Sequence, residues 1–288
     1  MFSKFFSNKL RSKVCFADGW DKFFENHGMS SFEDFFARFD PAHDGKETWS
    51  KKSKSDVQIF KLPDENQDTV FFLKRFRNAN TKTTTRAFMQ RGRIISRGKL
   101  ECSNARLLIE NGIGAYEPVC FGEKSIFGFE TDSFVVTKKL DMQCLEDFVA
   151  QKWKSLSLQE QKKLITELVK TIRKAHSLNV SIRDLYIKHI FINEDNDKFS
   201  FSFIDLENLW QNVFDPFTKA RDLGRLYFSM DDSNFSKQMK ELLVETYLAN
   251  APTWQKPLMR HLILSRAKKR KKRHSEKMKF AEKLKEKV

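Results

Sequence analysis

Side chains that could move a proton and hold a metal ion recur at fixed offsets in the second half of the chain. Asp184 follows an arginine in the segment SIRDLYIKHIFIN, and His189 stands five residues later. A carboxylate can orient an attacking hydroxyl group and accept its proton, whereas an imidazole can coordinate a metal or hold a phosphate oxygen. Asp205 ends the apolar run FSFI, where a carboxylate can bind magnesium. We therefore expect a catalytic base at Asp184 and metal ligands at His189 and Asp205, with a core histidine as the alternative for His189.

Two residues in the first half of the chain could hold phosphate groups. Lys74 lies among apolar residues in TVFFLKRF, which is typical of a strand, and Glu101 lies in the helix-like segment that follows. A strand lysine fixed by a helix glutamate positions nucleotide phosphates in kinases. For Lys74 alone, an ordinary surface lysine is the alternative. Asp222, in KARDLGRLYF, is predicted either as an acid at the start of a helix or as a brace for the loop that carries Asp184.

The elements that must position these residues fall into a strand-rich half and a helix-rich half. Apolar patterning and turn signals predict strands at residues 56–62 and 69–76, then at PVCFGE, FGFE and DSFVVTKKL. Helical spacing predicts helices at 92–111, 145–154, 157–177 and from about 219 to 266, with a short hairpin formed by HIFIN and FSFIDL. This order predicts an α+β, two-lobed protein-kinase-like fold, with one helix in a strand-rich N-lobe and a helical C-lobe.

The same patterns predict four segments. We expect an N-terminal helical extension at 1–40, an N-lobe at 41–137, a C-lobe at 138–265 and a basic tail at 266–288. Aromatic residues along residues 17–40 and a cap signal at Ser30 and Ser31 favour helix in the extension. The first residues alternate Phe and Lys at helical spacing, which fits either an interfacial amphipathic helix or a helix packed on the main domain.

Charge is concentrated at the C-terminal end. The chain has a net charge of +15, and the tail after Ser265 contributes +9 of it, with twelve Lys and Arg against three Glu. A solvated, partly helical tail, a surface that docks on anionic lipid headgroups and a nucleic-acid contact all fit such a block. No aromatic-interleaved binding motif accompanies it, so nucleic acid is not favoured as a partner.

Composition excludes several classes of protein. No run of about 18 apolar residues is present, and the N-terminus lacks the apolar region of a secretory signal. The four cysteines are far apart and form no CxxC motif, so neither a zinc site nor a disulfide framework is indicated. We therefore expect a reduced, cytoplasmic protein. No pattern in the sequence indicates an oligomeric state.

The number of residues between Asp205 and Asp222 indicates which kind of molecule could accept the phosphate group. Protein kinases need a long activation segment and a peptide-docking platform between the magnesium-binding Asp and the next helix. Here Asp205 and Asp222 are only 17 residues apart, and no APE sequence lies between them. A small acceptor that bears a hydroxyl group fits this spacing better than a peptide.

At these residues the chain resembles the lipopolysaccharide kinase family, which comprises the core heptose kinases and Kdo kinases. The matching segments are FFLKRF, ECSNARLLIENGIGAYEPVCFGE, RDLYIKHIFIN, FIDLEN and RDLGRLYFS, within Val57 to Ser229. The resemblance implies ATP- and Mg²⁺-dependent phosphorylation of a heptose or Kdo hydroxyl of the inner core, by a protein peripheral to the cytoplasmic face of the inner membrane. By the same resemblance, Asp184 matches the catalytic Asp, Lys74 the ATP-anchoring Lys and Glu101 its partner, with His189 and Asp205 at the metal positions.

Three positions depart from the family pattern. Ile182 replaces a structural His before the Arg-Asp pair, and Lys138 stands where the hinge residue is commonly acidic. The expected phosphate-covering loop, near Asp44–Asp56, contains a single glycine, Gly45. These departures leave a non-catalytic kinase-fold binding module as an alternative to the sugar kinase. A protein Ser/Thr kinase is a further alternative.

Overall fold

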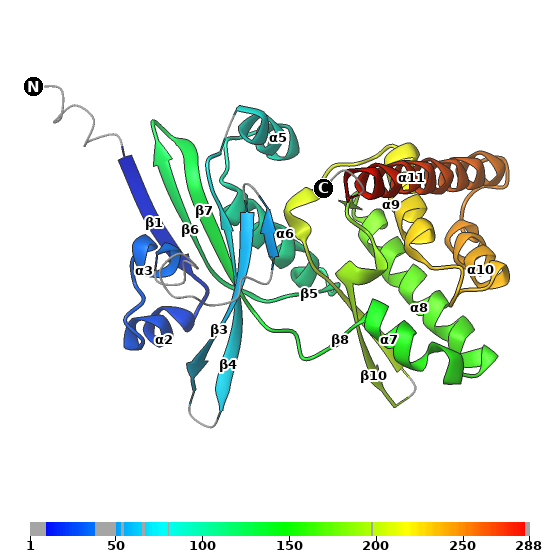
Figure 1. The fold of residues 1–288 in the computed structure, drawn as a ribbon, viewed down its shortest axis with the longest axis horizontal. Helices are drawn as coiled ribbons and strands as arrows, with labels where there is room; N and C mark the ends of the chain where they lie inside the picture. Colours follow the sequence, from blue (N-terminus) through cyan, green and yellow to red (C-terminus); the bar gives the residue numbers. More distant parts are fainter. Residues whose placement is uncertain are drawn as a thin grey trace, which may run out of the picture. The chain divides into compact units, whose positions relative to one another are not determined.

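The computed structural model describes residues 10–37, 50–52, 55–64, 67–79, 81–196 and 198–285 (Figure 1). The chain divides into two compact units, Met1–Asp141 and Met142–Val288. Within the described residues, no helix is both long enough and apolar enough to cross a membrane.

The first unit is built on a six-stranded antiparallel sheet with the strand order β1-β6-β7-β4-β3-β2. Its strands are β1 (Leu10–Phe16), β2 (Ser50–Lys52), β3 (Ser55–Pro63), β4 (Asp68–Phe76), β6 (Pro118–Ile126) and β7 (Phe129–Lys138). Its helices are α2 (Trp20–Asn26), α3 (Phe32–Phe36), α5 (Thr81–Arg91) and α6 (Arg97–Glu110), and the short strand β5 (Gly114–Ala115) follows α6.

Helices cover both faces of this sheet (Figure 1). Phenylalanines of α2 and α3 pack with Phe71, Phe134 and Val136 on one face, and α6 packs with Phe76 and Val135 on the other. Alternate residues of a strand point to opposite faces, which is why Phe134 and Val135 belong to different clusters. The phenylalanine-rich composition therefore fills the core of the first unit.

The N-terminal segment differs from the predicted helical extension. Leu10–Phe16 forms the edge strand β1, paired with β6 from Leu10↔Ile126 to Phe16↔Cys120, so it belongs to the sheet. The helix expected at 17–40 appears as α2 and α3, separated at Gly28, whose φ is +69°. Ser31 caps α3 as its sequence signal predicts, because its side chain accepts from the backbone N–H of Asp34. Residues 1–9, where the interfacial helix is expected, lie outside the described residues.

The expected single helix of the N-lobe is joined by a second one. This second helix, α5, was not predicted from its sequence, TKTTTRAFMQR, because four threonines lower the helix propensity of the segment. The helix expected from residue 92 begins instead at Arg97, because Ser96 accepts from the N–H of Lys99 and caps it.

The second unit is mainly helical. Its helices are α7 (Leu145–Lys152), α8 (Leu158–Ser177), α9 (Pro216–Ser229), α10 (Lys237–Leu248) and α11 (Lys256–Lys285), with the 3-10 turns η1 (Trp153–Ser155), η2 (Ile187–His189) and η3 (Leu206–Asn208). Its strands are β8 (Gln143–Cys144), β9 (Ser181–Ile182), β10 (Ile190–Asp195), β11 (Lys198–Phe203) and β12 (Leu209–Trp210). The apolar stripe predicted for α8 is buried: Leu164, Ile165, Leu168, Val169 and Ile172.

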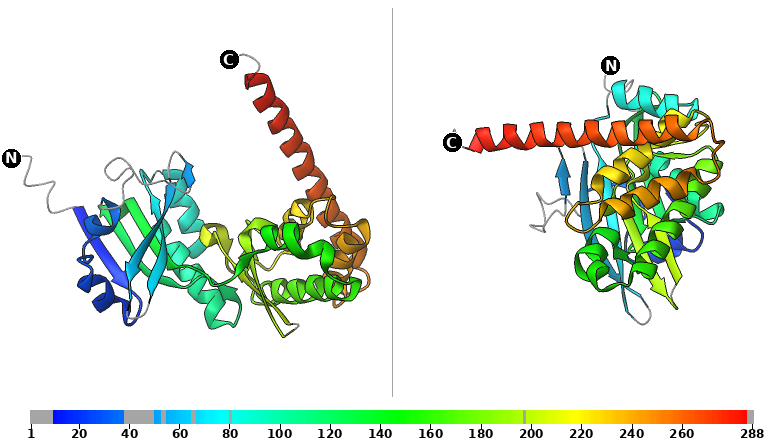
Figure 2. Two further views of the ribbon diagram at one scale, coloured as in Figure 1. Left: turned by 60° about the horizontal axis from the view of Figure 1, so that its bottom comes forward. Right: turned by 90° about the vertical axis from the view of Figure 1, so that its right-hand side faces the viewer.

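The basic tail is not a separate segment. Lys256–Lys285 forms one helix, α11, which runs through the boundary predicted at residue 266. Ile263 and Ala267 lie on either side of that boundary and are both buried. The sequence pattern did not reveal this continuity, because Ala267, four residues after Ile263, is followed directly by a run of lysines and arginines. The view in Figure 2 shows α11 extending beyond the other helices of its unit.

Candidate active site

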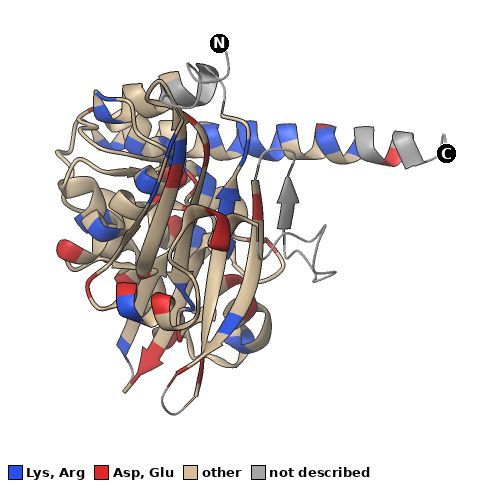
Figure 3. Cartoon of the chain, turned by 90° about the vertical axis from the view of Figure 1, so that its left-hand side faces the viewer, with Lys and Arg blue, Asp and Glu red and all other residues tan. Residues whose placement is uncertain are grey.

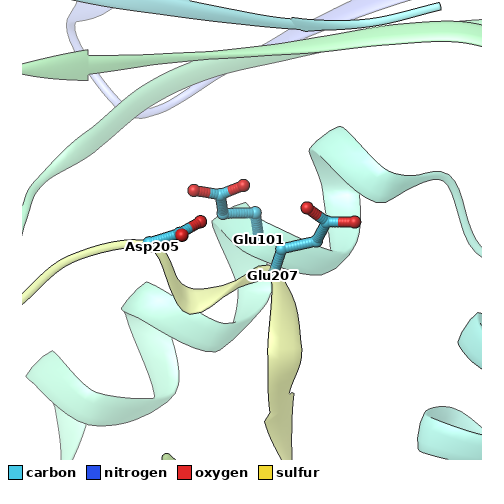
Figure 4. A group of neighbouring side chains, drawn as sticks. All are labelled: Glu101, Asp205 and Glu207. Atoms are coloured by element: carbon cyan, nitrogen blue, oxygen red, sulfur yellow. The ribbon is translucent and has the colours of Figure 1, made fainter. Parts of the chain in front are cut away.

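Lys74 and Glu101 meet in the first unit. The Lys74 Nζ lies 2.8 Å from the Glu101 Oε2, and the side chains are 17% and 4% exposed. The hydroxyl of Tyr116, also buried, donates to the other carboxylate oxygen at 2.8 Å. Glu101 projects from α6 (Figure 4) and Lys74 from the second half of β4. The pair leaves a partly exposed ammonium group held in one place, which suits it to bind phosphate oxygens.

The start of α6 is fixed against β6 and β7, which explains why Glu101 reaches Lys74. The N–H of Gly98 donates to the Ser133 hydroxyl at 3.0 Å, and the N–H of Arg97 donates to Glu130 at 3.2 Å. A Cβ on Gly98 would lie 2.3 Å from the carbonyl oxygen of Phe134, so only glycine permits this approach. Burial raises the pKa of Glu130, although Arg97 beside it acts in the opposite direction.

In the second unit, one hairpin brings the predicted catalytic residues to the same end. β10 pairs antiparallel with β11, so the residue before β10 and the residues after β11 lie side by side. The backbone N–H of Ile204 donates to the carbonyl of His189 at 3.0 Å, which places the backbones of His189 and Asp205 at this end. Asp205 itself adopts a left-handed conformation, with φ of 55°, and starts the turn η3.

A second pairing fixes Asp184. β9 pairs antiparallel with β12, with Ile182 opposite Leu209, and this brings Asn208 to the loop that follows β9. The Asn208 amide donates to the Asp184 Oδ2 at 2.5 Å. Ile182 is buried in this pairing, so the residue that replaces the structural His of the family serves as packing.

His189 is oriented by the same loop. Its Nδ1 lies 2.8 Å from the carbonyl oxygen of Asp184. Because a carbonyl only accepts, Nδ1 carries the hydrogen, and in the neutral ring the lone pair then sits on Nε2. The bond thus selects the tautomer that could coordinate through Nε2.

Asp205 has an acidic neighbour that the sequence analysis did not single out. The carboxylates of Asp205 and Glu207 each place an oxygen within 4.8 Å of the other, and both extend from the turn before β12 (Figure 4). The buried Oδ1 of Asn208 has no hydrogen-bond partner among the described residues. Glu207 and Asn208 both lie in the motif FIDLEN, but only Asp205 has a counterpart in the usual kinase pattern.

Asp222 is not at a helix start. α9 begins at Pro216 with Asp215 as its cap, whereas Asp222 is fully buried in the middle of the helix. His176 Nε2 lies 3.3 Å from Asp222 Oδ2, and Tyr247 contacts His176 Nδ1 at 2.7 Å. Burial, and then the charge of Asp222, raise the pKa of the Tyr247 hydroxyl, which therefore stays protonated and donates to His176. These two contacts, from Tyr247 to His176 and from His176 to Asp222, join the helices α10, α8 and α9.

Two further positions depart from the family pattern: Lys138 and the expected phosphate-covering loop. Lys138 ends β7, with its ammonium 6.0 Å from the centre of the Trp20 ring. Residues 44–49 and 53–54 of the expected phosphate-covering loop lie outside the described residues, and the rest of it belongs to β2 and β3.

Comparison with known proteins decides the family. The model of the Lipopolysaccharide kinase (Kdo/WaaP) family matches residues 62–247, more than half of the chain. The chain belongs to this lipopolysaccharide kinase family. It is therefore a kinase by family, and the resemblance seen in its motifs is confirmed.

A solved structure agrees with this family. WaaP in complex with acyl carrier protein superposes with a TM-score of 0.64 at 19% sequence identity, covering 90% of this chain and 98% of that chain. This likeness confirms the predicted kinase-like fold class. No curated protein matches the chain.

The donor set in the second unit fits a magnesium ion. Mg²⁺ prefers hard oxygen ligands, chiefly carboxylates together with substrate phosphates. Asp205 and Glu207 supply two neighbouring carboxylates, and the unpartnered oxygen of Asn208 is a third oxygen donor on the same turn. An imidazole nitrogen is a softer ligand, so the carboxylates suit this ion better than His189 does.

Proposed function

We propose that this protein transfers the terminal phosphate of ATP to a hydroxyl group of a heptose or Kdo sugar in the lipopolysaccharide inner core. The observation that carries the proposal is the fixed position of Asp184. Its carboxylate accepts from Asn208 at 2.5 Å, and its carbonyl accepts from His189 at 2.8 Å. A carboxylate held in this way, in a member of this kinase family, has the role of a catalytic base.

Each polar residue then has a distinct task. Asp184 orients the sugar hydroxyl and accepts its proton as the bond from the sugar oxygen to the γ-phosphorus forms and the bond from that phosphorus to ADP breaks. Lys74, held by Glu101, binds phosphate oxygens of the nucleotide. Asp205 and Glu207 of the turn η3 would hold Mg²⁺, with His189 of the turn η2 as a softer ligand. The ion would neutralise phosphate charge when bound.

The connection to α9 supports a small acceptor. After β12 ends at Trp210, only residues 211–215 precede the helix. Five residues are too few to build a peptide-docking platform of the kind that protein kinases carry. A sugar hydroxyl requires no such platform.

The basic helix supports a location at a membrane. The Lys and Arg residues of α11 follow one another along the helix (Figure 3), and every described side chain from Lys271 to Lys279 is exposed. Like charges four residues apart destabilise an isolated helix, and an anionic surface would relieve this repulsion. We therefore place the protein at the cytoplasmic face of the inner membrane, where its glycolipid acceptor is made.

The proposal is tested by transfer from ATP to purified core lipopolysaccharide in the presence of Mg²⁺. Asp184→Asn should lower kcat by about 10²- to 10⁴-fold, because it removes the proton acceptor but keeps the size of the side chain. Asp195→Asn, at an exposed position, is the matched control and should keep wild-type activity. Undiminished transfer by Asp184→Asn would refute the proposal.

Two other results would point to the alternatives. A melting temperature that does not respond to ATP and Mg²⁺, together with no transfer, would favour a non-catalytic binding module. Strong labelling of a generic peptide would favour a protein Ser/Thr kinase.

A further inference from the structure

The helix α11 has a packed half and an exposed half. Met259, Ile263 and Ala267 are buried at successive four-residue steps, which turns one stripe of the helix toward the rest of the second unit. A Cβ on Gly224 of α9 would lie 2.7 Å from the Cβ of Arg266, so the two helices approach as closely as their backbones allow. Beyond Arg270, the described side chains up to Lys279 are exposed.

Arg270 stands where the packed stripe ends, and it contacts the loop that carries Asp184. Its guanidinium donates to the hydroxyl of Tyr186, and the centre of the guanidinium lies 5.7 Å from the centre of the Tyr186 ring. The Tyr186 ring meets the His189 ring edge to face, with centroids 5.8 Å apart and an interplanar angle of 88°. A cation on α11 therefore holds the aromatic ring that packs against His189.

Backbone bonds tie Tyr186 to the proposed base. The N–H of Tyr186 donates to the Asp184 carbonyl at 2.9 Å, and the N–H of His189 donates to the Tyr186 carbonyl at 2.8 Å. The His189 ring donates to the same Asp184 carbonyl. A displacement of the Tyr186 ring would therefore disturb the Tyr186 N–H and the His189 ring, which both donate to the Asp184 carbonyl.

We infer that Arg270 is a positioning residue: by holding Tyr186, it fixes the His189 ring and the Asp184 loop for phosphate transfer. This inference rests on the proposed function, because it assigns part of the same site to a helix that the sequence places in a tail. Deletion of the chain from residue 266 onward would therefore also remove the contact that supports the loop carrying Asp184. Ser229 of α9 supports the loop from a second side, since its hydroxyl accepts from the N–H of Ile187 at 3.0 Å.

The first arm of the test compares single and double variants in the full-length protein. With ATP, Mg²⁺ and a deacylated, soluble core oligosaccharide, Arg270→Met should lower kcat about tenfold and leave KM for ATP unchanged. Arg270→Lys should recover part of the loss, because it restores a cation over the ring. Arg273→Met, which removes the same charge from an exposed position on the next turn, should match the wild type.

Tyr186→Phe keeps the ring against His189 but removes the hydroxyl acceptor, so it should lower kcat in the same direction. If the two residues act through one contact, the double variant Arg270→Met/Tyr186→Phe should be no slower than the slower single variant. Losses that multiply in the double variant, or a kcat of Arg270→Met within about twofold of Arg273→Met, would overturn the inference. Should Arg270→Met fail to fold, Tyr186→Phe carries the same test.

The second arm does not depend on an acceptor. The imidazole signals of His189, assigned in ¹H–¹⁵N spectra with His189→Gln, should shift in Arg270→Met and stay in place in Arg273→Met. Unchanged His189 signals in Arg270→Met would overturn the positioning role. Shifted signals in a protein that transfers no phosphate would support the contact and refute only the proposed function.

Discussion

Asp184 is held by residues that come from two different segments, and this arrangement defines the site at the scale of single residues. Asn208 reaches it through the β9–β12 pairing, and His189 reaches its carbonyl from within the same loop. The sequence predicts Asp184, His189 and Asp205 because their offsets follow a known order. It does not single out Asn208, because the bond to Asp184 depends on a pairing between two-residue strands that periodicity cannot detect.

Glu207 is the residue whose proposed role depends most directly on the metal. Glu207→Gln should raise the Mg²⁺ concentration needed for half-maximal transfer by about tenfold, since a neutral amide replaces one of two neighbouring carboxylates. The exposed Glu146→Gln serves as the control and should keep the wild-type Mg²⁺ requirement. A Mg²⁺ titration of the transfer rate measures both. An unchanged requirement in Glu207→Gln would exclude it from the metal site.

At the scale of elements, the strongly periodic segments were predictable and the ends of the chain were not. The stripe of α8, the strand that carries Lys74 and the strand β11 that precedes Asp205 follow from apolar spacing. β1 was not predicted, because its residues LRSKVCF alternate poorly and its pairing partner, β6, lies about a hundred residues away. α11 was divided at residue 266 because the charge run hid Ala267, which continues the buried stripe.

Deletions of the exposed half and of the packed half of α11 should have different effects on vesicle binding and turnover. Removing residues 271–288 should weaken binding to anionic vesicles by at least about tenfold, with a loss that shrinks as salt rises, and should spare turnover of a soluble acceptor. Removing residues 266–288 should also impair turnover, because it deletes Ala267 and Arg270. Removing only residues 286–288, whose charges cancel, is the control and should leave vesicle binding unchanged.

Equal vesicle binding by the protein that lacks residues 271–288 would contradict the membrane role of α11. A protein partner would be the competing occupant of this exposed basic helix. If the full-length protein bound a protein partner but no vesicles, that result would favour a protein as the occupant of α11.

At the scale of the whole molecule, the net charge of +15 and the proposed chemistry belong to different groups of residues. The excess of basic residues accumulates along α11, whereas Asp205 and Glu207 are neighbouring carboxylates at one hairpin end of the same unit. Asp184 is joined to their turn through its hydrogen bond from Asn208. The charge therefore indicates where the protein would bind, and the carboxylates indicate what it would do there. The proposed function connects the two, because the acceptor proposed for this member of the lipopolysaccharide kinase family is an anionic glycolipid.

The most direct measurement is mass spectrometry of lipopolysaccharide cores from three strains: one with the intact gene, one without it and one that carries Asp184→Asn. We expect a core phosphate present in the first strain to be absent from the other two, and fragmentation would identify the sugar that carries it. Equal amounts of the Asp184→Asn and wild-type proteins in the cells, checked by immunoblot, exclude loss through misfolding. Cores with the same phosphate in all three strains would contradict the account.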